Sequence, residues 1–135
     1  MKTPLIFAAL AATMMPAALF APIAAPAFAK PPVVSVVTIR MAHRGFHPQV
    51  IRLKGGQRYR LRFINSDRTE HDFYAPDFFA NARLEPGAML DNGRLNVRGG
   101  NVRTITLTPA SGHYQAKSSK ALDVVSNMTA QILVY

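Results

Sequence analysis

The stretch GFHPQVIRLKGGQRYRLRFINSDRTEHDF, residues 45–73, carries the clearest structural signal in the chain. Within residues 58–65, apolar side chains such as Leu61 and Phe63 alternate with arginines. This period of two places successive side chains on opposite faces of a strand. Residues 49–54 alternate in the same way, and the Gly-Gly pair between the two segments indicates a turn. The stretch therefore predicts two strands joined by a glycine turn.

On both sides of this stretch the pattern continues as short strands. We expect strands at residues 33–40, 102–108, 114–116 and 129–135, separated by Gly, Pro and Asn. Several short strands at near-regular spacing indicate an all-β sandwich. Residues 75–100 are different, because they alternate little and are rich in Gly and Pro. In that region we expect one short helix at about residues 77–83, with Asp77 as its N-cap.

Three segments of the chain resemble one known family, the cupredoxins, and the last of them, the closing stretch up to Met128, corresponds to the loop that carries metal ligands in that family. Residues 45–73 match its first half through Phe46-x-Pro48-x-x-Ile51, a glycine turn, an alternating strand, Asn65 and His71. The sequence LTPASGHYQAK, residues 107–117, is similar to the penultimate strand, with its Gly-x-Tyr corner. The first half also looks like the EfeO-type cupredoxin-like domains of exported bacterial proteins. The resemblance covers nearly all of residues 33–135 and implies a cupredoxin-like Greek-key β-sandwich.

The resemblance also implies where a metal would bind. Blue-copper cupredoxins hold copper with a His, a Cys, a second His and an axial Met. Here the first His corresponds to His71 and the Met to Met128, whereas the cysteine position is Ser118 and the second His position is Asp123. The chain contains no cysteine at all. Because the thiolate is essential to the blue-copper electron carrier, we expect neither blue-copper electron transfer nor the intense visible absorption of that site.

The expected strand order places further candidate ligands at the same end of the fold. If the strands run alternately up and down, the connection at residues 41–47 lies at the same end as His71, and so does the last loop. Imidazole and thioether together suit copper, and the thioether favours Cu(I). The candidate metal ligands are therefore His71, Met128, His43, His47 and Met41.

Each candidate also has an interpretation that needs no metal. His71 and Met128 are compatible with a hydrogen-bonded histidine and a gap-filling core methionine. His43 and His47 are loop residues near Arg44, whose charge repels a cation. Asp123 is expected to cap or solvate a loop.

Two functions remain open from the residues alone. One is copper handling, the binding of Cu(I) or Cu(II) for delivery or buffering without electron transfer. The alternative is a metal-free binding module that docks an anionic periplasmic or membrane partner through a basic face. No nucleophile elbow, carboxylate pair or phosphate-binding loop is recognisable, so we expect no enzymatic activity. The residues expected on the basic face are Arg40, Arg52, Lys54, Arg58, Arg60 and Arg62.

The first 29 residues have the pattern of a secretory signal peptide. Lys2 precedes a long apolar segment rich in alanine, and Ala27-Phe28-Ala29 provides a cleavage site of the small-x-small type. A retained membrane anchor is the alternative, since the apolar segment is nearly long enough to span a bilayer. We expect cleavage, a domain at residues 30–135, export to the periplasm and no transmembrane segment afterwards. The formal net charge is +9 for the full chain and +8 without Lys2 of the signal peptide, and in that compartment it favours anionic surfaces over nucleic acid as partners.

Overall fold

The computed structural model describes residues 33–135, so the predicted signal peptide at residues 1–29 lies outside the described residues. The strands are β1 (Ser35–Ala42), β2 (Gly45–His47), β3 (Val50–Leu53), β4 (Tyr59–Asn65), β5 (His71–Tyr74), β6 (Arg83–Leu84), β7 (Arg94–Val97), β8 (Val102–Thr108), β9 (Gly112–Lys117) and β10 (Thr129–Val134). The helices are α1 (Pro76–Ala80) and α2 (Ala121–Val125). Neither helix has the length and apolar character needed to cross a membrane.

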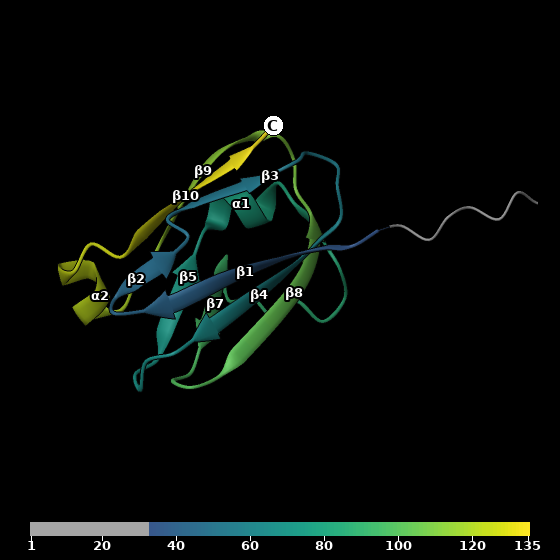
Figure 1. The fold of residues 1–135 in the computed structure, drawn as a ribbon. Coiled ribbons are helices and arrows are strands. Elements are labelled where there is room, and N and C mark those ends of the chain that lie inside the picture. Colours follow the sequence, from purple (N-terminus) through teal and green to yellow (C-terminus); the bar gives the residue numbers. More distant parts are fainter. Residues whose placement is uncertain (1–32) are drawn as a thin grey trace, which may run out of the picture. The chain divides into compact units, whose positions relative to one another are not determined.

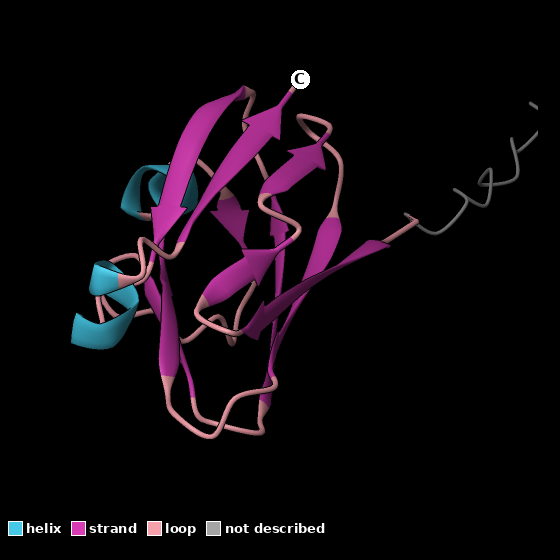
Figure 2. Ribbon diagram, turned by 60° about the vertical axis from the view of Figure 1, so that its left-hand side comes forward, coloured by secondary structure: helices cyan, strands magenta, loops and turns pink. Residues whose placement is uncertain are grey.

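The strands form two sheets that pack face to face (Figures 1 and 2). The first, here called the β4 sheet, has the strand order β2-β1-β4-β8-β6, and the second, the β10 sheet, has the order β3-β10-β9-β5-β7. β1 pairs with β4 in parallel, as β3 does with β10, and the other pairs are antiparallel. The architecture confirms the predicted all-β Greek-key sandwich.

The core follows directly from the alternation seen in the sequence. Leu61 and Phe63 on β4 point inward and are buried, whereas the arginines between them are exposed. Phe73 on β5 packs against Phe63 and Phe46, with ring centroids 4.9 and 5.2 Å apart. Aromatic contacts of this kind between the two sheets contribute about 1 kcal/mol each beyond the area they bury.

The short helix expected in the region of residues 75–100 is present as α1, but its bounds and its N-cap differ from the expectation. α1 begins at Pro76 and ends at Ala80, and Asp77 makes no side-chain cap, so the expected N-cap at Asp77 is wrong. Proline at the first helical position already has a helical φ and lacks the amide hydrogen that a cap would satisfy. Arg83 lies outside the helix because it pairs with β8 as part of β6. The sequence also gave no signal for the short helix α2.

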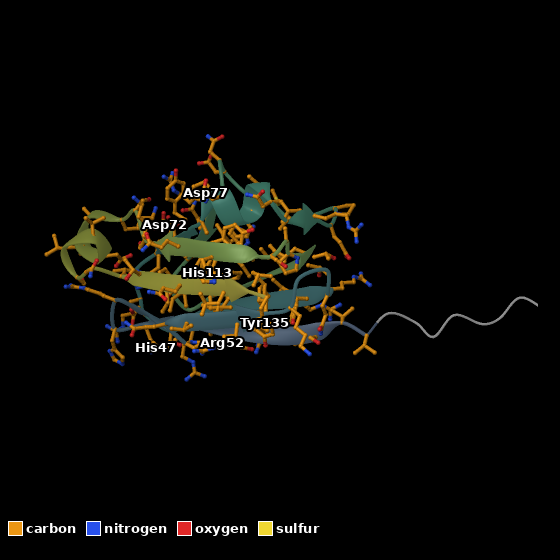
Figure 3. All side chains as sticks on the ribbon, turned by 90° about the horizontal axis from the view of Figure 1, so that it is seen from above. His47, Arg52, Asp72, Asp77, His113 and Tyr135 are labelled. Atoms are coloured by element: carbon orange, nitrogen blue, oxygen red, sulfur yellow. The ribbon has the colours of Figure 1, made fainter. Side chains whose placement is uncertain are left out.

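The expected basic face is divided between the two sheets. Arg40 lies on β1 and Arg60 and Arg62 on β4, all in the β4 sheet. Arg52, in contrast, lies on β3, which pairs with β10. The glycine turn after β3 therefore carries the chain from one sheet to the other, and a single face covering all six residues does not form. Figure 3 shows Arg52 with His47 on one side of the molecule and Asp72 with Asp77 on the other.

Three loops meet at one end of the sandwich. The β1–β2 turn lies beside the β4–β5 loop, since the amide of Ser66 donates to the carbonyl of Met41 over 3.0 Å. The β9–β10 loop, which contains α2, reaches the same end through the contact between Asp123 and His71. The predicted convergence of these loops is therefore present.

Candidate functional site

The candidate site is a cluster of hydrogen-bonded side chains where these three loops meet. Its centre is His71, the first residue of β5, which is only 2 % exposed. The β4–β5 loop contributes Asp67, and β5 itself contributes Asp72. The β9–β10 loop contributes Ser118 and Asp123, which is the buried residue of α2.

Both ring nitrogens of His71 contact carboxylates. Nδ1 lies 2.7 Å from Oδ2 of Asp123, and Nε2 lies 2.8 Å from Oδ2 of Asp67. Burial alone would lower the pKa of His71, but the hydrogen bonds to Asp123 and Asp67 outweigh it and raise the pKa above the ordinary value. The protonated imidazolium, with an N–H on each nitrogen, can donate to both carboxylates at once.

Asp67 is held in place by the β4–β5 loop around it. The side chain of Asn65 shapes this loop: Nδ2 donates to the carbonyls of Thr69 and Val97 over 2.8 and 2.9 Å, and Oδ1 accepts the amide of Asp67. Burial raises the pKa of Asp67, but the hydrogen bonds from His71 and from the backbone of the β1–β2 turn lower it overall. Asn65, a landmark of the sequence resemblance, therefore positions a residue of the cluster.

Ser118 connects the two remaining carboxylates. Its Oγ lies 2.6 Å from Oδ2 of Asp123 and 2.5 Å from Oδ1 of Asp72. Because a hydroxyl has a single proton, it donates to one of the two carboxylates at a time. Asp72 is fully buried and also accepts the amide and hydroxyl of Ser119, while Arg94 Nε lies 3.0 Å from its Oδ2. Burial raises the pKa of Asp72, but the hydrogen bonds from the two serines lower it overall.

The structure places the five predicted metal ligands in different surroundings. Met41 and Met128 are buried, at 0 % and 2 % exposure, whereas His43 and His47 are exposed. His43 reaches the cluster only through its backbone amide, which donates to Asp67 over 3.3 Å. Among residues 33–135, no group of three or more His, Asp or Glu side chains is placed to hold a metal ion. The assignment of these five residues as metal ligands remains a prediction.

The residues present do not fit a blue-copper centre. At the positions that the sequence resemblance assigns to the thiolate and the second imidazole, Ser118 supplies a hydroxyl and Asp123 a carboxylate. Both nitrogens of His71, through which a metal would bind, already contact carboxylates. The expectation that Asp123 caps or solvates a loop is wrong, because it is 2 % exposed and contacts His71 and Ser118.

The cluster also lacks the geometry of a nucleophilic triad. In such a triad a base takes the proton of the nucleophile. Here the hydroxyl of Ser118 contacts the carboxylates of Asp72 and Asp123, and the imidazole of His71 contacts Asp123 and Asp67. No hydrogen bond joins Ser118 to His71 among the described residues, so the base does not reach the hydroxyl.

Sequence reasoning missed three members of the cluster, namely Asp67, Asp72 and Ser119. Asp67 lies four residues before His71. In a loop, unlike in a helix, this spacing does not determine whether the two side chains meet. Asp72 follows His71 on a strand, where neighbouring side chains point to opposite faces. It joins the cluster only because the β9–β10 loop folds over it. In the sequence, the only indication that Asp72 belongs to the cluster is its position next to His71.

Comparisons with known proteins agree with this architecture. The family model described as a cupredoxin-like domain matches residues 6–117, a match that ends one residue before Ser118. Auracyanin B is similar in structure, with a TM-score of 0.58 and 18% identity, covering 79% of this chain and 92% of that one. Auracyanin A from Chloroflexus aurantiacus, described as a "blue" copper protein, gives 0.56 and 14%, covering 76% and 100%.

A third similar structure is the dithionite-reduced auracyanin from Roseiflexus castenholzii, with a TM-score of 0.57 and 16% identity, covering 75% of this chain and 97% of that one. At these identities the likeness shows the fold. No curated protein matches the chain.

Proposed function

The chain belongs to the cupredoxin-like domain family, and from this premise we propose that it is an exported, metal-free binding module without enzymatic activity. It docks an anionic periplasmic or membrane partner through the outer face of its β4 sheet. The proposal that the protein binds no metal rests on one observation, the contact of both ring nitrogens of His71 with carboxylates. The signal-peptide pattern of residues 1–29 supports export.

The metal-free proposal follows from what a cation would have to displace. A metal at His71 needs neutral imidazole, and binding releases the proton that the ring carries. In this cluster the neighbouring carboxylates favour the protonated ring and raise its pKa. The positive charge of the imidazolium therefore takes the place that a metal ion has in blue-copper relatives. The cluster acts as a structural anchor for three loops.

The docking part follows from the charges on the β4 sheet. We define the basic face as Arg40, Arg60, Arg62 and Arg83, which are exposed and point away from the core. None of them forms an ion pair with the described acidic residues. The nearby carboxylate, Glu85, pairs with Arg58.

The pKa of Glu85 shows that the electrostatic potential around the basic face is positive. The hydrogen bond from Arg58 lowers this pKa, and the charges of Arg60 and Arg83 lower it further. Alternate residues of a strand are about 6.7 Å apart, so Arg60 and Arg62 present a row of charges to a polyanion. Such rows attract anionic partners over about one Debye length.

The docking proposal is tested with polyanion probes. The purified protein is titrated with heparin and with polyglutamate, and compared with the Arg60→Glu/Arg62→Glu variant. We expect the charge reversal to weaken binding at least tenfold. The matched control is Arg68→Glu/Arg98→Glu, which makes the same change in net charge at exposed arginines outside the basic face. If the two double variants weaken binding equally, binding depends on the net charge of the protein and not on the position of the arginines. That result would contradict docking by the basic face.

Copper handling is the second candidate function, and one observation favours it. Ser118 and Met128, at the cysteine and methionine positions, line a common cavity of about 240 Å³. A competition titration with Cu(I) and Cu(II) of the wild type, His71→Ala and Met128→Ala separates the two functions. The metal-free proposal expects no binding tighter than millimolar. Tighter binding that is lost in His71→Ala would establish copper handling in its place.

A further inference from the structure

Helix α2 shows the reverse of the usual burial pattern. Its buried residue is Asp123, at 2 % exposure, whereas Leu122, Val124 and Val125 are 59 %, 58 % and 86 % exposed. A surface helix normally buries its apolar side chains and exposes its charged ones. A group of exposed apolar residues, rather than a single one, indicates a contact surface.

The polar cluster fixes this arrangement from beneath. Asp123 contacts Nδ1 of His71 over 2.7 Å and Oγ of Ser118 over 2.6 Å. Its carbonyl accepts the amide of Met128 over 3.0 Å, which closes the loop after the helix. Rotating α2 to bury its valines would bring the carboxylate of Asp123 out of these contacts. The apolar side chains are therefore held outward at the end of the sandwich, where Figure 1 shows α2 protruding.

The surroundings of α2 are basic. Lys117 is exposed and lines a cavity together with Val124, and Lys120 occupies the N-cap position of the helix. The neighbouring β1–β2 turn carries the exposed Arg44, and the β4–β5 loop the exposed Arg68. Among the acidic residues of this end, Asp67 and Asp123 belong to the cluster around His71, and Glu70 pairs with Lys120 over 2.7 Å.

We propose that the exposed apolar side chains of α2 insert into the headgroup region of an anionic lipid bilayer. Two features favour a bilayer over a protein partner. A stable protein interface needs about 800 Å² on each side, far more than three side chains of a five-residue helix provide. Shallow insertion of a few apolar residues, in contrast, is strengthened by each basic residue that reaches the anionic headgroups.

The inference concerns a surface other than the basic face. It goes beyond the proposed function, and it stands or falls separately from polyanion binding by Arg60 and Arg62. The probes are vesicles of phosphatidylglycerol and phosphatidylcholine, mixed in equal parts, and vesicles of phosphatidylcholine alone.

The first measurement uses fluorescence, because the chain contains no tryptophan. Val125→Trp places one indole on α2, and Met89→Trp places one at a residue that is 77 % exposed in the β6–β7 connection. We expect the emission of Val125→Trp to shift to the blue on mixed vesicles and to be quenched by lipids with brominated acyl chains. Met89→Trp should respond to neither.

The second measurement is sedimentation with vesicles. Val124→Ser should weaken binding to mixed vesicles at least fivefold, whereas Val33→Ser, whose valine is 70 % exposed and precedes β1, should change it less than twofold. Equal effects of the two serine variants, or equal responses of the two indoles, would overturn the proposal. So would a blue shift that grows with protein concentration without lipid, since it would assign α2 to contact between two copies of the chain.

Discussion

His71 is the residue that the sequence resemblance assigns to the first metal ligand, and its imidazole lies between Asp67 and Asp123. A proton on this ring provides the positive charge that two nearby carboxylates require. Ser118, at the cysteine position, donates within the same network. At the scale of the residue, the cluster is a buried hydrogen-bonded network that joins the β4–β5 and β9–β10 loops.

The first prediction is a loss of stability above neutral pH. His71 has a raised pKa in the folded chain and an ordinary value of 6.5 when unfolded. Below pH 6.5 both states are protonated, so the stabilisation is fully present. As the pH rises towards the folded pKa, the unfolded chain loses its proton first and the free energy of unfolding falls, by about 1.4 kcal/mol for each unit by which the two pKa values differ.

Urea unfolding from pH 6 to pH 9 measures this effect, and the His71→Gln variant is the control because it carries no proton to lose. The wild type should lose stability relative to the variant across this range. At the acid side, the lowered pKa values of Asp67 and Asp72 predict a second loss of stability as the pH falls below 3.8, their ordinary value. A pH-independent difference between wild type and His71→Gln from pH 6 to 9 would contradict the raised pKa.

The second prediction concerns Asp123. Asp123→Ala leaves Nδ1 of the buried His71 and the hydroxyl of Ser118 without this acceptor. Loss of one partner from a buried polar pair costs about 3 kcal/mol, and thermal or urea unfolding measures it. Asp123→Asn keeps the shape and one acceptor oxygen, so it should cost about 1 kcal/mol. An equal cost for the two variants would indicate that packing, rather than the hydrogen bonds, sets the stability of α2.

At the scale of the element, the β9–β10 loop determines which chemistry this end of the fold supports. The amide of Ser118 donates to the carbonyl of Met128 over 3.0 Å, so the two ends of the loop are joined next to His71. Between them, α2 turns Asp123 inward. A loop closed in this way can present different residues at the same positions without changing the sandwich.

The third prediction is that two substitutions in this loop restore a coloured copper site. In Ser118→Cys/Asp123→His, a thiolate and a second imidazole join His71 and Met128 as possible copper ligands. The same variant removes the carboxylate that contacts Nδ1 of His71. With Cu(II) we expect intense visible absorption, because the thiolate supplies the charge-transfer band, and we expect none for the wild type. Asp67 would remain on Nε2 and orient the ring.

The control for this experiment is Ser118→Cys alone, in which Asp123 still contacts His71. It should bind Cu(II) more weakly and absorb less than the double variant. A colourless double variant would show that the correspondence of Ser118 and Asp123 with the cysteine and histidine positions is wrong. Intense colour in the wild type would contradict the assignment of the thiolate position as Ser118.

At the scale of the whole molecule, the charge is distributed unevenly between surface and interior. The carboxylates of Asp72 and Asp123 are buried in the cluster, while the arginines of the basic face stay exposed. Exposed cations without acidic partners repel one another, which costs stability but keeps the protein soluble and available to anionic surfaces. Among residues 33–135, the excess of positive charge therefore lies outside the cluster.

The fourth prediction follows from this distribution. Binding to heparin should weaken steeply between 50 and 300 mM salt, since the Debye length shortens from more than 10 Å to about 6 Å over this range. The slope of log affinity against log salt should become smaller in Arg60→Glu/Arg62→Glu, which removes two of the contributing charges. The free energy of unfolding of the wild type should not fall over this range, because the buried pairs are screened less than exposed charges and the repulsion among the exposed arginines is weakened. An unchanged slope in the variant would contradict the role of the basic face.

The sequence alone determined the fold class and the core. The alternation of Leu61 and Phe63 with arginines depends only on the period of a strand, which is a local property. The absence of cysteine from the sequence likewise excludes a thiolate site. These features could be read directly, because each depends on neighbouring residues or on composition.

Only the tertiary structure decided what the candidate site contains. Asp67 and His71 come from the β4–β5 loop and the start of β5, whereas Ser118 and Asp123 come from the β9–β10 loop. Their contacts depend on how these two segments fold together at the end of the sandwich. The same holds for the basic face, where Arg52 left the predicted row because β3 pairs with β10. Hydrogen bonds between side chains distant in sequence act over about 3 Å. No local pattern specifies such distances, so the packing of the two sheets and their loops determined them.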